Sequence, residues 1–350
     1  MIYSKIFGQT RLSSQSLQVV EMLVVSALVF LFTVLLTRKI LPVLKAKKMG
    51  QNISVYIEEH KSKQGTPTMG GICMIIALLF VMLLWFVLEA CGLLGYKSNS
   101  MLIKAALTLC LGVCNGMVGF VDDYAKLIKK QNEGLTPIQK SALQLFVACA
   151  YLAVMGMSGN LSLYLRIPFT DFSLYLGWFA YPIYLLFIVG FVNSTNITDG
   201  IDGLASSVAA SVAGCIMLVS AVYLDRYTGI ISAALLGATL GFLVFNHYPA
   251  KIFMGDTGSL FLGGIIMGCA VSTGEIVSVM IMGMVFILDM LSSLTQTLYF
   301  KLTHGKRLFK KAPVHHHFQM LGWSEVKIVT VFFLMSVIFC AVGYFGVVIH

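Results

Sequence analysis

The sequence predicts an all-α, polytopic integral membrane protein with about ten transmembrane helices. Its 350 residues are 58% hydrophobic and only 11% charged, and the mean hydropathy is +0.88. Both features lie outside the usual range of soluble domains. The apolar residues also form runs of about 20, the length at which a helix crosses the hydrocarbon with every backbone group paired. No repeat, low-complexity tract or linker divides the chain, so we treat residues 1–350 as a single domain.

Ten apolar runs are the predicted spans; eight are secure, and the fourth and eighth are short or rich in small residues. The first runs straight into Arg38 and Lys39, which is typical of a retained helix rather than a signal peptide. The second follows a turn that Pro67 and Gly70 shape. In order, the runs cover residues 19–37, 69–91, 101–121, 141–157, 173–193, 203–224, 229–246, 257–273, 276–300 and 327–349.

The distribution of cations predicts the orientation. Ten spans leave nine loops, and the odd-numbered loops all open on one side of the membrane. These five loops carry 7, 4, 0, 1 and 5 Lys and Arg residues, which is 17 of the 24 in the chain. The positive-inside rule therefore places the odd-numbered loops in the cytoplasm and both termini outside. A basic cytoplasmic face suits anionic headgroups or an anionic substrate, although topology alone explains it about as well.

The polar side chains that can carry chemistry gather in the same odd-numbered loops, although these loops are spread widely along the sequence. This pattern predicts one composite site at the cytoplasmic face. Its candidate members are Asp122, Asp123, Asp199, Asp202, Asp256, His315, His316 and His317.

Two of these aspartates, Asp122 and Asp123, end the third span, where the helix dipole disfavours carboxylates. Lys126 lies four residues after Asp122 on the same helix face and supplies one partner. Asp123 points about 100° away, which leaves it for a hard cation. The alternative is two solvated carboxylates at a helix end.

The segment NSTNITDGIDG offers Asn193, Asn196, Asp199 and Asp202 at a membrane boundary. The two aspartates are three residues apart, so they share a face if the sixth helix begins there. A helix cap accounts for Thr198 or Asp199 but not for the whole set. We therefore predict a polar binding segment here.

In the segment FMGDTGS, Gly255 and Gly258 bracket Asp256 and Thr257 just before the eighth span. Free backbone N–H groups at such a helix start attract phosphate, and the Asp256 carboxylate is able to bind Mg²⁺. The motif alone is weak, because glycine-rich turns also begin ordinary membrane helices.

Three consecutive histidines, His315 to His317, lie in the last cytoplasmic loop. If this segment is helical, the rings fan out by about 100° each, so all three cannot easily bind one ion. Phosphate contact or proton transfer by one or two of them is the functional interpretation, and a solvated surface run is the alternative. Asp289 differs because it lies inside the ninth span. An intramembrane carboxylate is either a functional residue or a buried structural hydrogen-bonding group.

Five segments together resemble the phospho-N-acetylmuramoyl-pentapeptide transferase family of the polyprenyl-phosphate N-acetylhexosamine 1-phosphate transferase superfamily. The resemblance covers most of the chain and keeps the order and spacing of the family motifs. They are TPTMGG at 66–71, DDYAK at 122–126, NITDGIDG at 196–203, FMGDTGS at 253–259 and HHHF at 315–318. The family pattern continues as HHHFE, whereas this chain has Gln319. An acid or metal role is therefore excluded at that position.

The resemblance implies ten membrane helices with outward termini and a cytoplasmic active-site cleft in a bacterial plasma membrane. It also implies transfer of phospho-MurNAc-pentapeptide from UDP-MurNAc-pentapeptide to undecaprenyl phosphate, giving lipid I and UMP. By the same resemblance Mg²⁺ is the cofactor and Asp256 its ligand. Membrane lipid is an expected partner, nucleic acid is not, and a homodimer follows by analogy alone. The implied catalytic residues are Asp122, Asp123, Asp256, His315 and His316, and the implied substrate-binding residues are Lys63, Lys126, Lys140, Asn193, Asn196, Asp199, Gly200, Asp202, Phe253, Gly255, Ser259 and His317.

These residues suit phosphoryl transfer, which needs neutralisation of charge more than covalent chemistry. We expect direct in-line attack by the lipid phosphate, positioned or deprotonated by Asp122 or Asp123. A covalent phospho-aspartyl intermediate is the alternative mechanism. Alternative functions are a sister transferase that uses UDP-N-acetylglucosamine, a secondary transporter with Asp289 as the coupling residue, and a lipid-binding scaffold. Transporters concentrate polar groups in mid-helix and often contain repeats, and neither feature is seen here.

Overall fold

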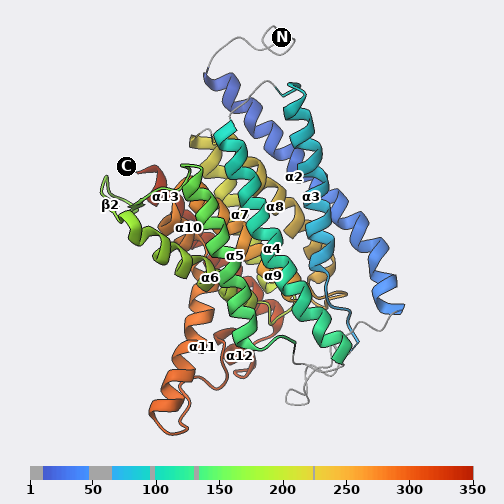
Figure 1. Ribbon diagram of the computed structural model, residues 1–350. Helices are drawn as coiled ribbons and strands as arrows, with labels where there is room; N and C mark the ends of the chain where they lie inside the picture. The colour runs from blue at the N-terminus through green and yellow to red at the C-terminus, as the bar shows by residue number, and fades with distance from the viewer. Residues whose placement is uncertain (1–10, 47–64, 95–98, 130–133, 224, 350) are drawn as a thin grey trace.

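The computed structural model is a bundle of long helices with one small β-hairpin (Figure 1). It describes residues 11–46, 65–94, 99–129, 134–223 and 225–349. The helices long enough to cross a membrane begin and end as follows: α2 Arg11–Ala46, α3 Gly71–Ala90, α4 Asn99–Lys129, α5 Pro137–Met157, α6 Ala180–Thr198, α7 Leu204–Tyr223, α8 Arg226–Asn246, α9 Gly255–Thr273, α11 Met284–Leu302 and α13 Glu325–Val348. The short elements are β1 Tyr164–Arg166, β2 Ser173–Tyr175, the 3₁₀ turn η2 Gly177–Phe179, α10 Ile276–Met282 and α12 Val314–Gln319.

The predicted fold class is confirmed. Within the described ranges, nine helices are long and apolar enough to cross a membrane, and the α10–α11 pair makes ten if it counts as one span. The predicted start of the fifth span is wrong, because residues 173–175 form β2, paired antiparallel with β1 so that Leu165 lies opposite Leu174. The helix starts later and runs on to Thr198, which places Asn193 and Asn196 on its last two turns rather than in a loop.

Helix α9 forms the centre of the bundle and is buried from Thr257 to Ser272. Its closest neighbour is α4, and glycines allow the two backbones to approach. A Cβ on Gly112 of α4 would lie 2.4 Å from the Ile265 side chain, and one on Gly119 would lie 2.1 Å from the carbonyl oxygen of Asp256. Small residues allow such close contact between membrane helices. The contact brings the end of α4 that bears Asp122 and Asp123 against the first residues of α9.

The ninth predicted span is broken rather than straight. Helices α10 and α11 meet at Gly283 and are bent by 78°. A Cβ on Gly283 would lie 2.4 Å from the ring of Phe191 on α6, so a larger residue has no space at the bend. Beyond the bend, α11 runs out of the bundle toward the bottom of the view, where α12 lies beside it (Figure 1).

A largely buried ion pair network joins helices α2, α3 and α8. Arg226 is the first residue of α8, and its guanidinium donates to Glu21 on α2 at 2.7 Å and to Glu89 on α3 at 3.1 Å. The indole N–H of Trp85 also donates to Glu21, at 2.7 Å. This network lies at the start of α8, whereas the candidate site lies beyond the end of that helix.

Candidate active site

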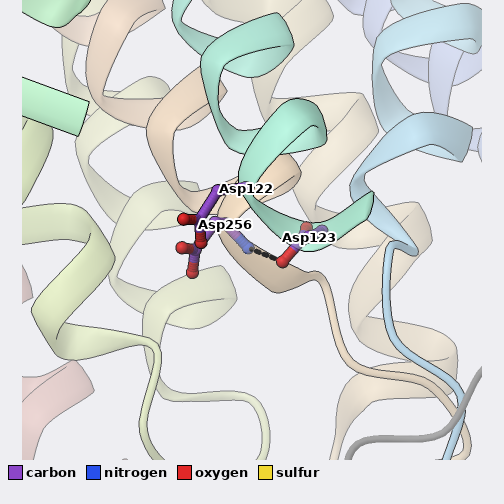
Figure 2. Close-up of side chains that lie close together, drawn as sticks. All are labelled: Asp122, Asp123 and Asp256. Atoms are coloured by element: carbon purple, nitrogen blue, oxygen red, sulfur yellow. Dashed lines mark hydrogen bonds between the residues drawn. The ribbon is translucent and has the colours of Figure 1, made fainter. Parts of the chain in front are cut away.

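Three carboxylates from α4 and α9 meet at the start of α9. Asp122 and Asp123 come from α4 and are each 3% exposed, and Asp256 is the second residue of α9. Each of the three offers one oxygen such that all three oxygens lie within 4.8 Å of one another. Figure 2 shows the Asp122 and Asp256 side chains next to each other and Asp123 on the other side of the α9 backbone. The expectation that these residues, far apart in sequence, come together is confirmed.

Asp123 holds the first turn of α9. Its Oδ1 accepts a hydrogen bond from the backbone N–H of Asp256 at 3.2 Å (Figure 2). Its Oδ2 accepts from the backbone N–H of Thr257 at 3.0 Å and from the Thr257 hydroxyl at 2.7 Å. Gly255 has a φ of +70°, and a Cβ there would lie 2.5 Å from Asp123 Oδ2. The prediction of free N–H groups for phosphate is therefore wrong for these two groups, because a carboxylate of α4 already binds them.

Two lysines converge on a single oxygen of Asp256. Asp256 Oδ2 lies 3.0 Å from Lys126 Nζ and 2.8 Å from Lys140 Nζ. Lys126 also lies 2.6 Å from Asp122 Oδ2, which confirms the pair expected from their spacing of four residues. Three carboxylates against two ammonium groups leave one negative charge in excess at a partly buried position. Such an arrangement attracts a further cation.

The start of α5 is fixed by a capping box, and this positions Lys140 one turn later. The Thr136 hydroxyl accepts from the backbone N–H of Gln139 at 3.2 Å, and the Gln139 side chain accepts from the N–H of Thr136 at 3.0 Å. Asp122 ties the preceding residue to α4, because its Oδ1 accepts from the N–H of Leu135 at 2.7 Å. Asp122 therefore has a scaffold contact as well as its contact with Lys126.

Asn196 on α6 links the lysines to α9. Its amide donates to Asp256 Oδ1 and to Ser259 Oγ, each at 2.9 Å, and its Oδ1 accepts from Lys140 Nζ at 2.7 Å. Ser259 is completely buried, so it orients Asn196 rather than lining an open surface. One turn earlier, Asn193 exchanges hydrogen bonds of 2.8 and 3.3 Å with Gln144 of α5. Sequence reasoning missed Gln144, which lies in an apolar run with no motif around it.

The turn between α6 and α7 carries Asp199, Gly200 and Asp202. The helical arrangement expected for the two aspartates is wrong, because Asp199 ends α6 and α7 begins only at Leu204. Asp202 is 4% exposed, and its Oδ2 accepts from the N–H of Ala250 at 2.9 Å. The contact ties this turn to the segment that leads into α9.

The Asp199 carboxylate is in an unfavourable environment when it is ionised. Burial raises its pKa well above the ordinary value, and the nearby carboxylates of Asp256, Asp123 and Asp202 raise it further. A raised pKa means that folding favours the protonated form, so the stability that this proton provides is lost as the pH rises above about 4 and through the folded pKa.

Replacing Asp199 with Asn should remove this pH-dependent destabilisation. We expect the apparent melting temperature of Asp199→Asn, measured in EDTA, to exceed that of the parent protein by a margin that grows as the pH rises above about 4. Asp171→Asn, at an exposed position, is the matched control. A margin that stays constant with pH would contradict the electrostatic account.

The TPTMGG segment pairs with the strand-like segment before α9. The N–H of Gly70 donates to the carbonyl of Phe253 at 2.9 Å, and the N–H of Phe253 donates to the carbonyl of Pro67 at 2.9 Å. These bonds hold the backbone of Phe253, which is half-buried and three residues before Asp256, against the TPTMGG segment. Lys63, predicted to bind the nucleotide end, lies outside the described residues.

The three histidines occupy the short helix α12 and contact three different partners, as the expected fanning of their rings requires. His315 is completely buried, with Nδ1 2.6 Å from Oδ2 of Asp289 on α11. His316 Nδ1 lies 2.6 Å from Gln319 Oε1. His317 Nδ1 accepts from the N–H of Lys310 at 3.1 Å. Of the three, His315 and His316 face Gly200, since a Cβ on that glycine would lie within 3.4 Å of Nε2 of each ring.

The fold and the site together define a class of protein: a polytopic helical membrane protein with carboxylates and lysines arranged for a cation and a phosphorylated ligand at its helix ends. Comparison with known proteins identifies the family within that class. Residues 105–274 match the model of glycosyl transferase family 4, and residues 63–76 match phospho-N-acetylmuramoyl-pentapeptide-transferase signature 1.

Curated relatives extend the match over nearly the full chain. The phospho-N-acetylmuramoyl-pentapeptide-transferases of Bacillus thuringiensis (strain Al Hakam) and Bacillus cereus (strain AH187) are each 38% identical over 328 residues. The match covers 93% of this chain and 98% of each relative. The chain belongs to the phospho-N-acetylmuramoyl-pentapeptide transferase family and is a multi-pass bacterial membrane protein.

Proposed function

We propose that this protein transfers phospho-MurNAc-pentapeptide from UDP-MurNAc-pentapeptide to undecaprenyl phosphate, with lipid I and UMP as products. Family membership supports the reaction. The structural observation that carries the proposal is the meeting of Asp122 and Asp256 with Lys126 and Lys140 at the ends of three helices, α4, α5 and α9. Both substrates are polyanions, and this cluster supplies the groups that neutralise phosphate charge.

Mg²⁺ is the cofactor that we propose for this cluster. The carboxylate oxygens are hard ligands, they lie close enough to share one ion, and the cluster has one negative charge in excess. Asp256 and Asp122 would hold the ion, because their side chains lie next to each other (Figure 2), whereas Asp123 accepts from two backbone N–H groups and the Thr257 hydroxyl at the start of α9. When bound, the ion would polarise the diphosphate and stabilise the departing UMP.

The protein's own residues would then orient the two phosphates. An oxygen of the lipid phosphate attacks the phosphorus attached to the sugar, and the bond from that phosphorus to the bridging oxygen of UMP breaks. The acceptor is a monoester with a second pKa of about 6, so at neutral pH it is mostly dianionic and needs little help from a base. Lys126 and Lys140 would neutralise the developing charge, and Asp199, Gly200 and Phe253 would bind the nucleotide end.

We infer that the site faces the cytoplasm, since the five odd-numbered loops predicted from the sequence, to which the site residues belong, hold 17 of the 24 lysines and arginines. Both termini would then be outside. A homodimer remains a prediction from family analogy.

The test is release of UMP by the purified protein in detergent, with Mg²⁺ present. We expect release only when UDP-MurNAc-pentapeptide and undecaprenyl phosphate are both supplied, and loss of release in EDTA. Release with UDP-N-acetylglucosamine instead would identify the sister transferase, and no release with either donor would refute the proposal. Recovery of a phosphorylated aspartate after incubation with donor alone would replace direct attack with the two-step mechanism.

A further inference from the structure

We propose that Asp289 and His315 form a positioning pair that holds the α6–α7 turn at Gly200 in the conformation that receives the nucleotide. The part that concerns the nucleotide rests on the proposed function. In this assignment His315 acts through the turn and does not touch the reacting atoms. Three groups of contacts support the pair.

The first group fixes the proton on the His315 ring. Both residues are completely buried. Asp289 accepts twice from the same partner: Oδ1 lies 3.4 Å from the backbone N–H of His315, and Oδ2 lies 2.6 Å from its ring Nδ1. A carboxylate oxygen that already faces this pair accepts hydrogen bonds, so Nδ1 is the donor to Oδ2 and carries a ring proton.

The second group concerns the other edge of the ring. His315 Nε2 is buried and has no hydrogen-bond partner among the described residues. It faces Gly200, where a Cβ would lie only 2.5 Å away. The φ of Gly200 is not in the left-handed region, so the restriction at this position is one of space and not of backbone conformation. The His315 ring therefore packs against the α6–α7 turn at Gly200 and limits how close the turn can approach α12. Because Nε2 is buried, a ligand cannot reach it.

The third group explains why the ring cannot move aside. Ser292 follows Asp289 by three residues and Gln296 follows Ser292 by four, so all three lie on one face of α11. Ser292 Oγ accepts from the N–H of Val314 at 2.9 Å, and Gln296 Oε1 accepts from the N–H of Phe309 at 2.9 Å. One face of α11 thus holds the segment before and within α12 at three points.

A double-mutant cycle between Gly200 and His315 tests the pair in the full-length protein. Gly200→Ala adds the Cβ that would collide with Nε2. His315→Asn is the complementary change, because the Asn Nδ2 can still donate to Asp289 while the outer edge of the ring is removed. Gly190→Ala on α6 is the control, since a Cβ there meets nothing within 4 Å.

We expect Gly200→Ala to lower the apparent melting temperature and His315→Asn to restore it in the double variant. Gly190→Ala should not lower it, because alanine without a clash favours a helix interior over glycine. UMP affinity, measured by calorimetry, should follow the same order, with a loss on the order of tenfold in Gly200→Ala that the double variant largely recovers. If the effects of Gly200→Ala and His315→Asn on the melting temperature were additive, the proposed pair would be wrong. This test of the contact does not depend on UMP binding, so it remains decisive if the proposed function fails. If His315→Asn reduced turnover at saturating substrate and left UMP affinity unchanged, His315 would be catalytic and the proposal wrong.

Asp289→Asn gives a second, conservative test. In this variant Oδ1 of the introduced Asn can still accept from the backbone N–H of His315, so its Nδ2 must donate to His315 Nδ1. His315 Nδ1 then accepts, and the ring proton lies on Nε2, where it points at Gly200. We expect this variant to weaken UMP binding in the parent background and to have little further effect beside His315→Asn. An equal loss in both backgrounds would show that Asp289 acts by some other route.

Discussion

Asp256→Asn should reduce UMP release by a factor on the order of 10³. The substitution keeps the size of the side chain and a hydrogen-bond acceptor for Asn196, but it removes the charge that Lys126 and Lys140 share. Without that charge the two ammonium groups repel each other and the proposed Mg²⁺ loses a ligand. The loss should therefore appear in turnover at saturating donor and acceptor, and raising Mg²⁺ should recover only part of it.

The measurement is steady-state UMP release in detergent, together with the apparent melting temperature. Asp171→Asn serves as the control, because Asp171 is exposed in the turn of the hairpin that precedes α6, whereas the site lies beyond the other end of that helix. We expect both variants to fold, with activity lost in Asp256→Asn alone. Retention of more than about a tenth of the parent rate would remove Asp256 from the reaction.

Asp123→Ala should damage both stability and activity, for a reason different from that at Asp256. Truncation leaves two buried backbone N–H groups and the Thr257 hydroxyl without their acceptor. Each buried donor without a partner costs roughly 1–3 kcal/mol, and the helix start also loses its neighbouring negative charge. The first turn of α9 carries Asp256, so we expect a clear fall in melting temperature and a loss of UMP release on the order of 100-fold.

Thr257→Val separates the two possible roles of Asp123. Valine keeps the shape and the backbone N–H of Thr257 but removes the hydroxyl contact of 2.7 Å. If Asp123 supports the helix start, Thr257→Val should give a smaller loss of stability in the same direction, of about 1 kcal/mol. If Asp123→Ala lost activity with an unchanged melting temperature, its carboxylate would belong to the reaction instead.

The predictable part of the fold is the part set by apolar runs. A run of about 20 such residues has one stable conformation in hydrocarbon, so the spans and the alternation of loops follow from composition. The alternation of loops then brings the two α4 carboxylates and Asp256 to the same side of the membrane, although Asp123 and Asp256 are 133 residues apart in the sequence. The ion pair between Asp122 and Lys126 was equally predictable, because residues four apart lie on the same face of any α-helix.

The unpredicted features depend on contacts between elements that are distant in sequence. The sequence around Asp123 contains no sign that its partners are the N–H groups of α9, since the contact requires the close approach that Gly119 allows. The run 276–300 looks like one straight span, but it is broken at Gly283, where the backbone lies in tight contact with Phe191 of α6. Which of the three histidines turns inward is likewise decided by α11, where Asp289 accepts from His315.

The burial of α9 against α4 determines which parts of the protein unfold first. Amide hydrogens in a helix that is buried from Thr257 to Ser272 exchange with solvent only when the whole bundle opens. Helix α12, in which only His315 is buried, is held by α11 and opens in a smaller and less costly fluctuation. On gradual heating the histidine side of the site should therefore be lost first. A partly inactivated preparation should then lose the proposed affinity for UMP while it keeps the proposed Mg²⁺ site at Asp256.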